Sequence, residues 1–143
     1  MKSLAEDLRH LKGKVDSGAS HLVSQLFFDN NIFYSFLEKA EAAGIHVPIQ
    51  AGIMPVVNKR QIERMVSLCG ASLPSKFRRI IEKYEHHPDA LRDAGVAYAV
   101  DQMVDLMAHN VDGVHLYTMN NPQIAKKICT SIESLIGIKT LTA

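Results

Sequence analysis

The sequence lacks several features on which whole classes of protein depend. Its 143 residues include no tryptophan and two cysteines, and its formal net charge is +1 from 16 basic and 15 acidic side chains. Without a basic field that could hold a phosphate backbone, nucleic acid is not expected as a partner. Cys69 and Cys129 lack metal-type spacing and each falls on the apolar stripe of a predicted helix, so we expect both as small core residues.

Long apolar runs are also absent. No stretch of about 18 apolar residues occurs, so no membrane span is expected, and residues 1–7 lack the apolar core of a secretory signal. With 47% hydrophobic and 22% charged residues, the chain has the composition of a globular protein with a core of its own. We therefore expect one domain over residues 1–143, located in the cytoplasm.

Helical periodicity and short apolar runs alternate along the chain. Ser3 and Glu6 form a capping-box pattern before the first helix, and proline or asparagine precedes most of the others. The predicted helices cover residues 4–16, 30–44, 58–70, 74–84, 88–110 and 121–135, and the predicted strands cover residues 21–28, 47–54 and 114–119.

The three predicted strands are apolar on both faces and are separated by helices. This pattern predicts parallel pairing in an α/β fold. Because a closed (β/α)8 barrel needs eight such units, the pattern alone leaves two architectures open, a small open sheet or a part of a barrel.

Catalytic motifs are mostly missing from the sequence. It contains no glycine-rich phosphate loop, no G-x-S-x-G elbow, no H-E-x-x-H and no paired C-x-x-C. His86 and His87 precede Pro88 in a polar turn and are interpreted as solvated. Asp101 and Asp105 lie four apart on one long helix, where a hydrated helix face explains them better than a catalytic dyad.

One polar residue, Gln25, interrupts an apolar strand. A buried amide needs partners for its oxygen and both N–H groups, which a neighbouring side chain or a ligand at the strand's carboxyl end could provide. An amide suits a mixed donor and acceptor edge such as that of a pterin or a nicotinamide. Gln61 and Met65 share a helix face after the second strand, where the pattern alone favours one exposed polar residue and one core residue.

Four sequence runs resemble one family. K-V-D-S-G-A at 14–19 leads to L-V-S-Q-L-F-F-D at 22–29, and G-I-M-P at 52–55 and H-L-Y-T-M-N at 115–120 follow. In this order and spacing they resemble the K-V-D-A-G-A, I-T-Q-F/L-F-F-D/E, P-G-I-L/F-P and H-F-Y-T-L-N runs of methylenetetrahydrofolate reductases.

The resemblance implies a fold and a reaction. Members of this family are eight-stranded β/α barrels that bind FAD. NADH or NADPH reduces the flavin, which then passes the hydride to 5,10-methylenetetrahydrofolate to give 5-methyltetrahydrofolate. This chain corresponds to the last three strands with their helices and the preceding helix, so the expected fold is a partial (β/α)8 barrel. The family's glutamate general acid lies on an earlier strand, and no catalytic residue is expected here.

The resemblance also assigns candidate substrate-binding residues. Gln25 matches the glutamine that bonds folate and the nicotinamide, and Gln61 matches a second glutamine that contacts folate. Met65 falls where some members have a phenylalanine that stacks on the substrate. Asn121 falls where many members have an arginine.

The first helix carries the candidate cofactor residues. Asp7 and Lys14 match residues that hold the FAD ribose and phosphates, and a lysine supplies a point charge suited to a diphosphate. His10 occupies another such position in place of the usual asparagine, and Gly13 replaces a common arginine.

These matches lead to two expectations about the isolated chain. It is an incomplete reductase, inactive alone, with FAD bound weakly or not at all, NAD(P)H as co-substrate and folate as substrate. It either self-associates or complements a missing N-terminal half. The alternative is a stand-alone partial-barrel subunit or binding module without activity of its own.

Overall fold

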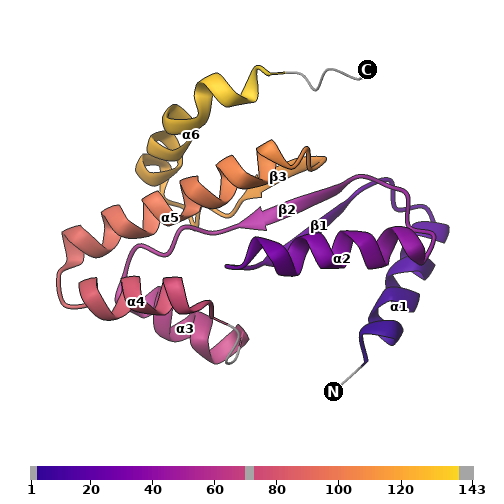
Figure 1. Ribbon diagram of the computed structural model, residues 1–143, viewed down its shortest axis with the longest axis horizontal. Helices are drawn as coiled ribbons and strands as arrows, with labels where there is room; N and C mark the ends of the chain where they lie inside the picture. Colours follow the sequence, from indigo (N-terminus) through magenta and orange to yellow (C-terminus); the bar gives the residue numbers. More distant parts are fainter. Residues whose placement is uncertain (1–2, 70–72, 139–143) are drawn as a thin grey trace.

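The computed structural model describes residues 3–69 and 73–138, which form an α/β fold (Figure 1). The predicted order of elements is confirmed over these ranges. The elements are α1 (Leu4–Asp16), β1 (Leu22–Leu26), α2 (Asn30–Ala42), β2 (Ile49–Ile53), α3 (Lys59–Cys69), α4 (Ser75–Tyr84), α5 (Pro88–Ala108), β3 (Gly113–Leu116) and α6 (Pro122–Ile136).

The strands form one parallel sheet in the order β1-β2-β3. Parallel pairing was predicted from their apolar composition and is confirmed. Neighbours in the sheet are also neighbours in sequence, with a helical crossover between each pair. Within the described residues, β1 and β3 each pair with β2 alone, so each leaves one edge open.

A hydrophobic core lies between the sheet and three helices. Its largest fully buried side chains are Ile53 of β2, Leu106 of α5 and Ile128 of α6. Phe33 of α2 is buried in the same core. Helix α5 contacts β2, β3, α2, α4 and α6 and runs along the sheet in Figure 1. None of the helices in the described ranges is long and apolar enough to cross a membrane.

A second hydrophobic cluster lies beyond the carboxyl ends of β1 and β2. Phe28 stacks on Phe77 of α4 with ring centroids 4.5 Å apart, and Phe77 contacts the ring of Tyr98 of α5. Met54 and Met65 are buried in the same cluster. The cluster therefore attaches α3, α4 and α5 to the strand ends, where the candidate substrate residues lie.

The predicted starts of α1, α2 and α6 are confirmed by side-chain hydrogen bonds. Ser3 and Glu6 form a reciprocal capping box on α1, Asp29 accepts from the Asn31 N–H at the start of α2, and Asn121 accepts from the Ile124 N–H at the start of α6. Gly44 follows α2 at φ +83°, a conformation that glycine adopts at no steric cost.

Some expectations were wrong in detail. The strands predicted over residues 21–28 and 47–54 are shorter, Leu22–Leu26 and Ile49–Ile53. The third strand ends at Leu116 rather than at residue 119, because Met119 and Asn120 adopt left-handed φ values of 50° and 60° that end the strand. Cys129 is exposed rather than in the core, since Ile124, Ile128 and Ile132 form the buried stripe of α6 and Cys129 lies beside it. The side chain of Cys69 lies outside the described part of the chain.

Candidate functional site

Gln25 lies in a β-bulge. Val23 pairs with Gln50, but the next aligned pair is Leu26 with Gly52, so β1 has one more residue than β2 over this interval. The Ser24 Oγ takes part in the ladder, accepting from the Gly52 N–H and donating to the Gln25 carbonyl, both at 2.8 Å. Bulges re-aim side chains, and here the bulge contains the candidate residue.

The Gln25 side chain is exposed, contrary to the expectation of a buried amide. The structure contains no hydrogen bond between this amide and another described residue. The physical reason is that no described segment covers this face of β1, where Val23 is 41% exposed as well. The interpretation of Gln25 as a residue satisfied by a neighbouring side chain is therefore not supported.

Gly52 of β2 and Tyr117, which directly follows β3, hold the bulge in place. The Tyr117 hydroxyl donates to the Ser24 carbonyl at 3.0 Å, so the tyrosine side chain crosses β2 at Gly52. A Cβ atom on Gly52 would lie 2.5 Å from the Ser24 carbonyl oxygen and 2.8 Å from Tyr117 Cε2. Only glycine leaves room for this crossing.

Gln61 lies in the first turn of α3, after the carboxyl end of β2. Its N–H donates to Asn58 Oδ1 at 2.8 Å, and its own Oε1 accepts from the Val57 N–H at 2.9 Å. This reciprocal cap, similar to a capping box, occupies the amide oxygen and leaves the Nε2 donors for another partner. Met65 is 5% exposed in the second hydrophobic cluster.

Asn121 lies after the carboxyl end of β3 and is the N-cap of α6, where its Oδ1 accepts from the Ile124 N–H at 3.2 Å. The structure therefore places Gln25, Gln61 and Asn121 at or beyond the carboxyl ends of three neighbouring parallel strands. Ligands of α/β proteins bind at this edge of the sheet.

The candidate cofactor residues share one face of α1. Asp7, His10 and Lys14 line a hollow of about 370 Å³ together with Leu11. Asp7 and Lys14 form no ion pair with another described residue, so a carboxylate and an ammonium group are free to meet a ligand. The hollow is lined by this one helix, which leads into the amino end of β1, away from α3 and α4 (Figure 1).

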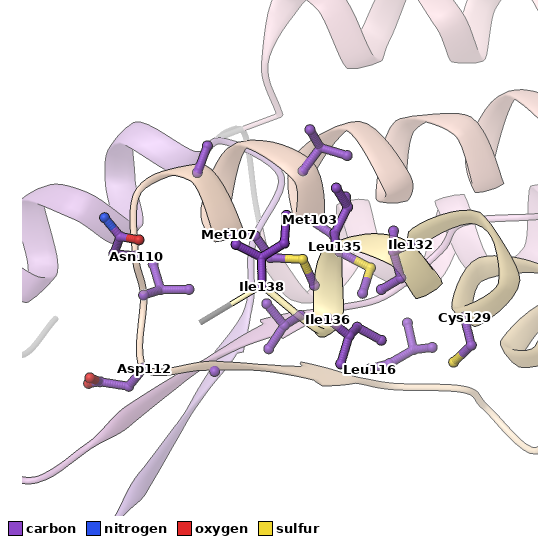
Figure 2. Close-up of a pocket in the computed structure, with 15 residues that line it drawn as sticks. Met103, Met107, Asn110, Asp112, Leu116, Cys129, Ile132, Leu135, Ile136 and Ile138 are labelled. Carbon is purple, nitrogen blue, oxygen red and sulfur yellow. The ribbon is translucent and has the colours of Figure 1, made fainter. Parts of the chain in front are cut away.

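An apolar hollow of about 790 Å³ lies beside the open edge of β3. Figure 2 shows side chains from α5, β3 and α6 around it, including Met107, Leu116 and Ile136. Ile136 is 63% exposed and Ile138 is 74% exposed. Large apolar side chains left open next to an unpaired strand edge mark a surface that favours a covering partner.

Sequence reasoning missed two polar residues of α5, Tyr98 and Gln102. Both are buried, and both donate hydrogen bonds to backbone carbonyls just after β1. Their spacing of four residues on an otherwise apolar helix face was the available signal, because a buried amide or phenol requires a partner.

Comparison with known proteins agrees with the resemblance seen in the sequence runs. Residues 1–133 match the family described as methylenetetrahydrofolate reductase. The chain is 35% identical over 119 residues to methylenetetrahydrofolate reductase (NADH) 1 of Arabidopsis thaliana, an alignment that covers 83% of this chain and 20% of that protein.

Two further relatives give similar values. Methylenetetrahydrofolate reductase 1 of Schizosaccharomyces pombe is 34% identical over 123 residues, covering 86% of this chain and 20% of that protein. The 5,10-methylenetetrahydrofolate reductase of Pectobacterium carotovorum is 30% identical over 131 residues, covering 92% of this chain and 44% of that protein. The chain thus spans less than half the length of these relatives. It belongs to the methylenetetrahydrofolate reductase family.

Proposed function

We propose that this chain forms the last three βα units of a (β/α)8 barrel and supplies its folate-binding edge. The reaction is the reduction of 5,10-methylenetetrahydrofolate to 5-methyltetrahydrofolate, with NAD(P)H as the hydride source. The observation that carries the proposal is the placement of Gln25, Gln61 and Asn121 at the carboxyl edge of consecutive parallel strands in a chain that belongs to this family.

The barrel interpretation is supported by the topology of the sheet. Sequential parallel strands with helical crossovers are the repeating unit of a barrel, and β1 and β3 each have an open edge. The apolar hollow beside β3 (Figure 2) has the lining that a further strand and helix would cover. On this proposal, residues 1–143 are one domain that is completed by strands from outside this chain.

The glutamines bind and orient the substrate. Gln25 is exposed with both ends of its amide unpaired within the described chain, so it can donate to and accept from the pterin edge. Gln61 offers its Nε2 donors, because its oxygen is held by the Val57 N–H. Asn121 offers its Nδ2 group in the same way, and Met65 supplies an apolar contact beneath the substrate.

The α1 residues fit one part of FAD. Asp7 can accept from ribose hydroxyl groups, Lys14 can neutralise a diphosphate, and His10 lies between them on the same helix face. The bound flavin supplies hydride transfer between NAD(P)H and the folate. The hollow is too one-sided to hold the whole cofactor, so the isoalloxazine contacts and the general acid come from other strands.

The proposal is tested by reconstitution. This chain is joined to, or mixed with, the first strands of a reductase barrel, and NAD(P)H oxidation is followed with and without methylenetetrahydrofolate. We expect a yellow complex whose folate-dependent turnover requires both parts. A stably folded, colourless chain that gains no flavin or turnover from any such half would favour the binding-module alternative.

A further inference from the structure

Two side chains of α5 hold the backbone just beyond Gln25. The Tyr98 hydroxyl donates to the Phe28 carbonyl at 2.5 Å, and the Gln102 Nε2 donates to the Phe27 carbonyl at 3.1 Å. Burial, and then the Asp29 and Asp101 carboxylates, raise the pKa of Tyr98 to about 12. The phenol therefore stays protonated and remains a donor at neutral pH.

Helix α5 is itself fixed against the neighbouring strand end. A Cβ atom on Gly95 would overlap the Val56 carbonyl group, so the backbones of α5 and the segment after β2 are in direct contact. Gly95, Tyr98 and Gln102 lie three and four residues apart, on one face of the helix. That face provides a rigid support for the carboxyl ends of both β1 and β2.

We infer that Tyr98 and Gln102 are positioning residues, which set the orientation of Gln25 toward the substrate by holding the Phe27 and Phe28 carbonyls. The inference rests on the proposed function of Gln25. It deepens that function by naming the groups that orient the binding amide without touching the substrate.

The Gln102 amide acts through its nitrogen, as its surroundings show. Its Nε2 serves two acceptors, the Phe27 carbonyl and Asn30 Oδ1 at 3.2 Å. Its Oε1 is buried and has no hydrogen-bond partner among the described residues. An apolar residue of similar volume would avoid this orphaned oxygen, so packing alone does not account for an amide here. The donor function accounts for it.

The bulge is the part of β1 where such support matters most. The ladder between β1 and β2 is interrupted at Ser24 and Gln25, and the other edge of β1 is open within the described residues. Pairing resumes at Leu26 with Gly52, and the α5 hydrogen bonds add a second restraint at Phe27 and Phe28, just beyond that pair. Displacement of a binding group by about 1 Å can cost on the order of a hundredfold in rate.

The test uses the assembled flavoenzyme that contains this chain. Tyr98→Phe and Gln102→Met each remove one donor while keeping the volume close to the original. Tyr34→Phe is the matched control, because its hydroxyl also bonds a residue of α5, Asp105 at 2.6 Å, but holds no strand-end carbonyl. Each change is made alone and together with Gln25→Ala, and kcat/KM for methylenetetrahydrofolate, flavin content and thermal midpoint are measured.

We expect Tyr98→Phe and Gln102→Met to lower kcat/KM roughly three- to thirtyfold, and to have no further effect once Gln25 is alanine. Flavin content should stay unchanged, and Tyr34→Phe should leave kcat/KM unchanged. The inference would be overturned if the losses in kcat/KM add to that of Gln25→Ala. It would also be overturned if kcat/KM falls in proportion to the thermal midpoint in these variants and in Tyr34→Phe alike. If Gln25→Ala itself leaves kcat/KM unchanged, the proposed function of Gln25 fails first, and the inference that rests on it falls with it.

Discussion

Helices α5 and α1 differ sharply in how they are held. Eight residues of α5 are buried, namely Leu91, Gly95, Val96, Tyr98, Ala99, Gln102, Met103 and Leu106. No residue of α1 is buried, and Leu4 is 46% exposed. Yet the capping box of α1 is complete, so local sequence signals are satisfied in both helices.

The difference separates the two halves of the proposed site. On this proposal, the substrate edge, which comprises Gln25, Gln61 and Asn121, is built from contacts within this chain, through α5 and the second hydrophobic cluster. Its geometry is therefore expected before any partner binds. The cofactor helix is defined locally, but its tertiary packing is sparse. Leu8, Leu11 and Val15 are only partly buried against the core. Helical stability in proteins comes mainly from packing of an apolar face, so on this proposal α1 gains further contacts from outside the chain.

The largest expected effect of this difference is that the isolated chain does not retain flavin. We expect the isolated chain to elute without FAD, because Asp7, His10 and Lys14 provide only one wall of a binding site. Gel filtration after incubation with FAD, followed by absorbance of the protein peak, measures this. Stoichiometric co-elution of flavin with the chain alone would show that α1 needs no further support.

We also expect the isolated chain to self-associate through its open strand edges and exposed apolar side chains. Within residues 3–69 and 73–138, the edges of β1 and β3 that face away from β2 carry unpaired backbone groups, and the exposed Val23, Ile136 and Ile138 add apolar surface. Burial of such surface contributes about 25 cal/mol per Å², so we expect oligomers at tens of micromolar. Light scattering coupled to size exclusion decides the matter, and a monodisperse species near 15.9 kDa would refute the expectation.

Core truncations should sharpen the contrast between the two helices. Leu106→Ala removes a fully buried side chain of α5 and should lower the free energy of unfolding by about 2–5 kcal/mol. The matched change Leu4→Ala on α1 should cost about 0.5 kcal/mol or less. Urea denaturation of both variants provides the measurement, and equal losses would mean that α1 is as well packed as α5.

Gln25→Ala should affect the substrate edge without affecting the cofactor helix. Loss of a hydrogen bond to substrate in a dry site costs about 1–3 kcal/mol, or roughly ten- to a hundredfold in rate. In the complete enzyme, stopped-flow reoxidation of the flavin by methylenetetrahydrofolate should slow by that factor while flavin content stays constant. Asn31→Ala, an exposed change beyond the bulge, is the control. An unchanged rate for Gln25→Ala would remove this residue from the site.

The smallest expected effect concerns Asp105, where α2 meets α5. Hydrogen bonds from Tyr34 and then Asn30 lower the pKa of Asp105 below its usual value. A carboxyl group with a lowered folded-state pKa stabilises the fold at neutral pH, and this contribution disappears as the pH falls through that pKa. Because Asp105 is exposed, Asp105→Asn should lower the thermal midpoint by at most about 3 °C at pH 7 and by less at pH 3. A larger loss at pH 3 would contradict the assignment.

Much of the fold could be predicted from local sequence. Ser3, Asp29 and Asn121 are helix caps with a specific hydrogen-bonding role, so the starts of α1, α2 and α6 could be predicted within a residue or two. The parallel sheet followed from strands that are apolar on both faces. Each of these features depends on neighbouring residues or on composition alone.

The features that could not be predicted from the sequence depend on contacts between residues that are distant in the chain. Regular alternation along a strand would put Val23, Gln25 and Phe27 on one face, but the bulge shifts the register between Val23 and Leu26. Phe27 therefore packs on Phe33 of α2, with ring centroids 4.9 Å apart. The bulge itself requires Gly52 and Tyr117, which lie 28 and 93 residues from Ser24. No local pattern in residues 21–28 signals it.

Amide hydrogen exchange compares α1 and α5 most directly. In the isolated chain, the amides of α5 between Val96 and Leu106 should exchange at least about a hundredfold more slowly than those of α1. After addition of the completing barrel half and FAD, α1 should become protected while α5 changes little. Equal protection of the two helices in the isolated chain, or no gain in α1 on reconstitution, would contradict the account.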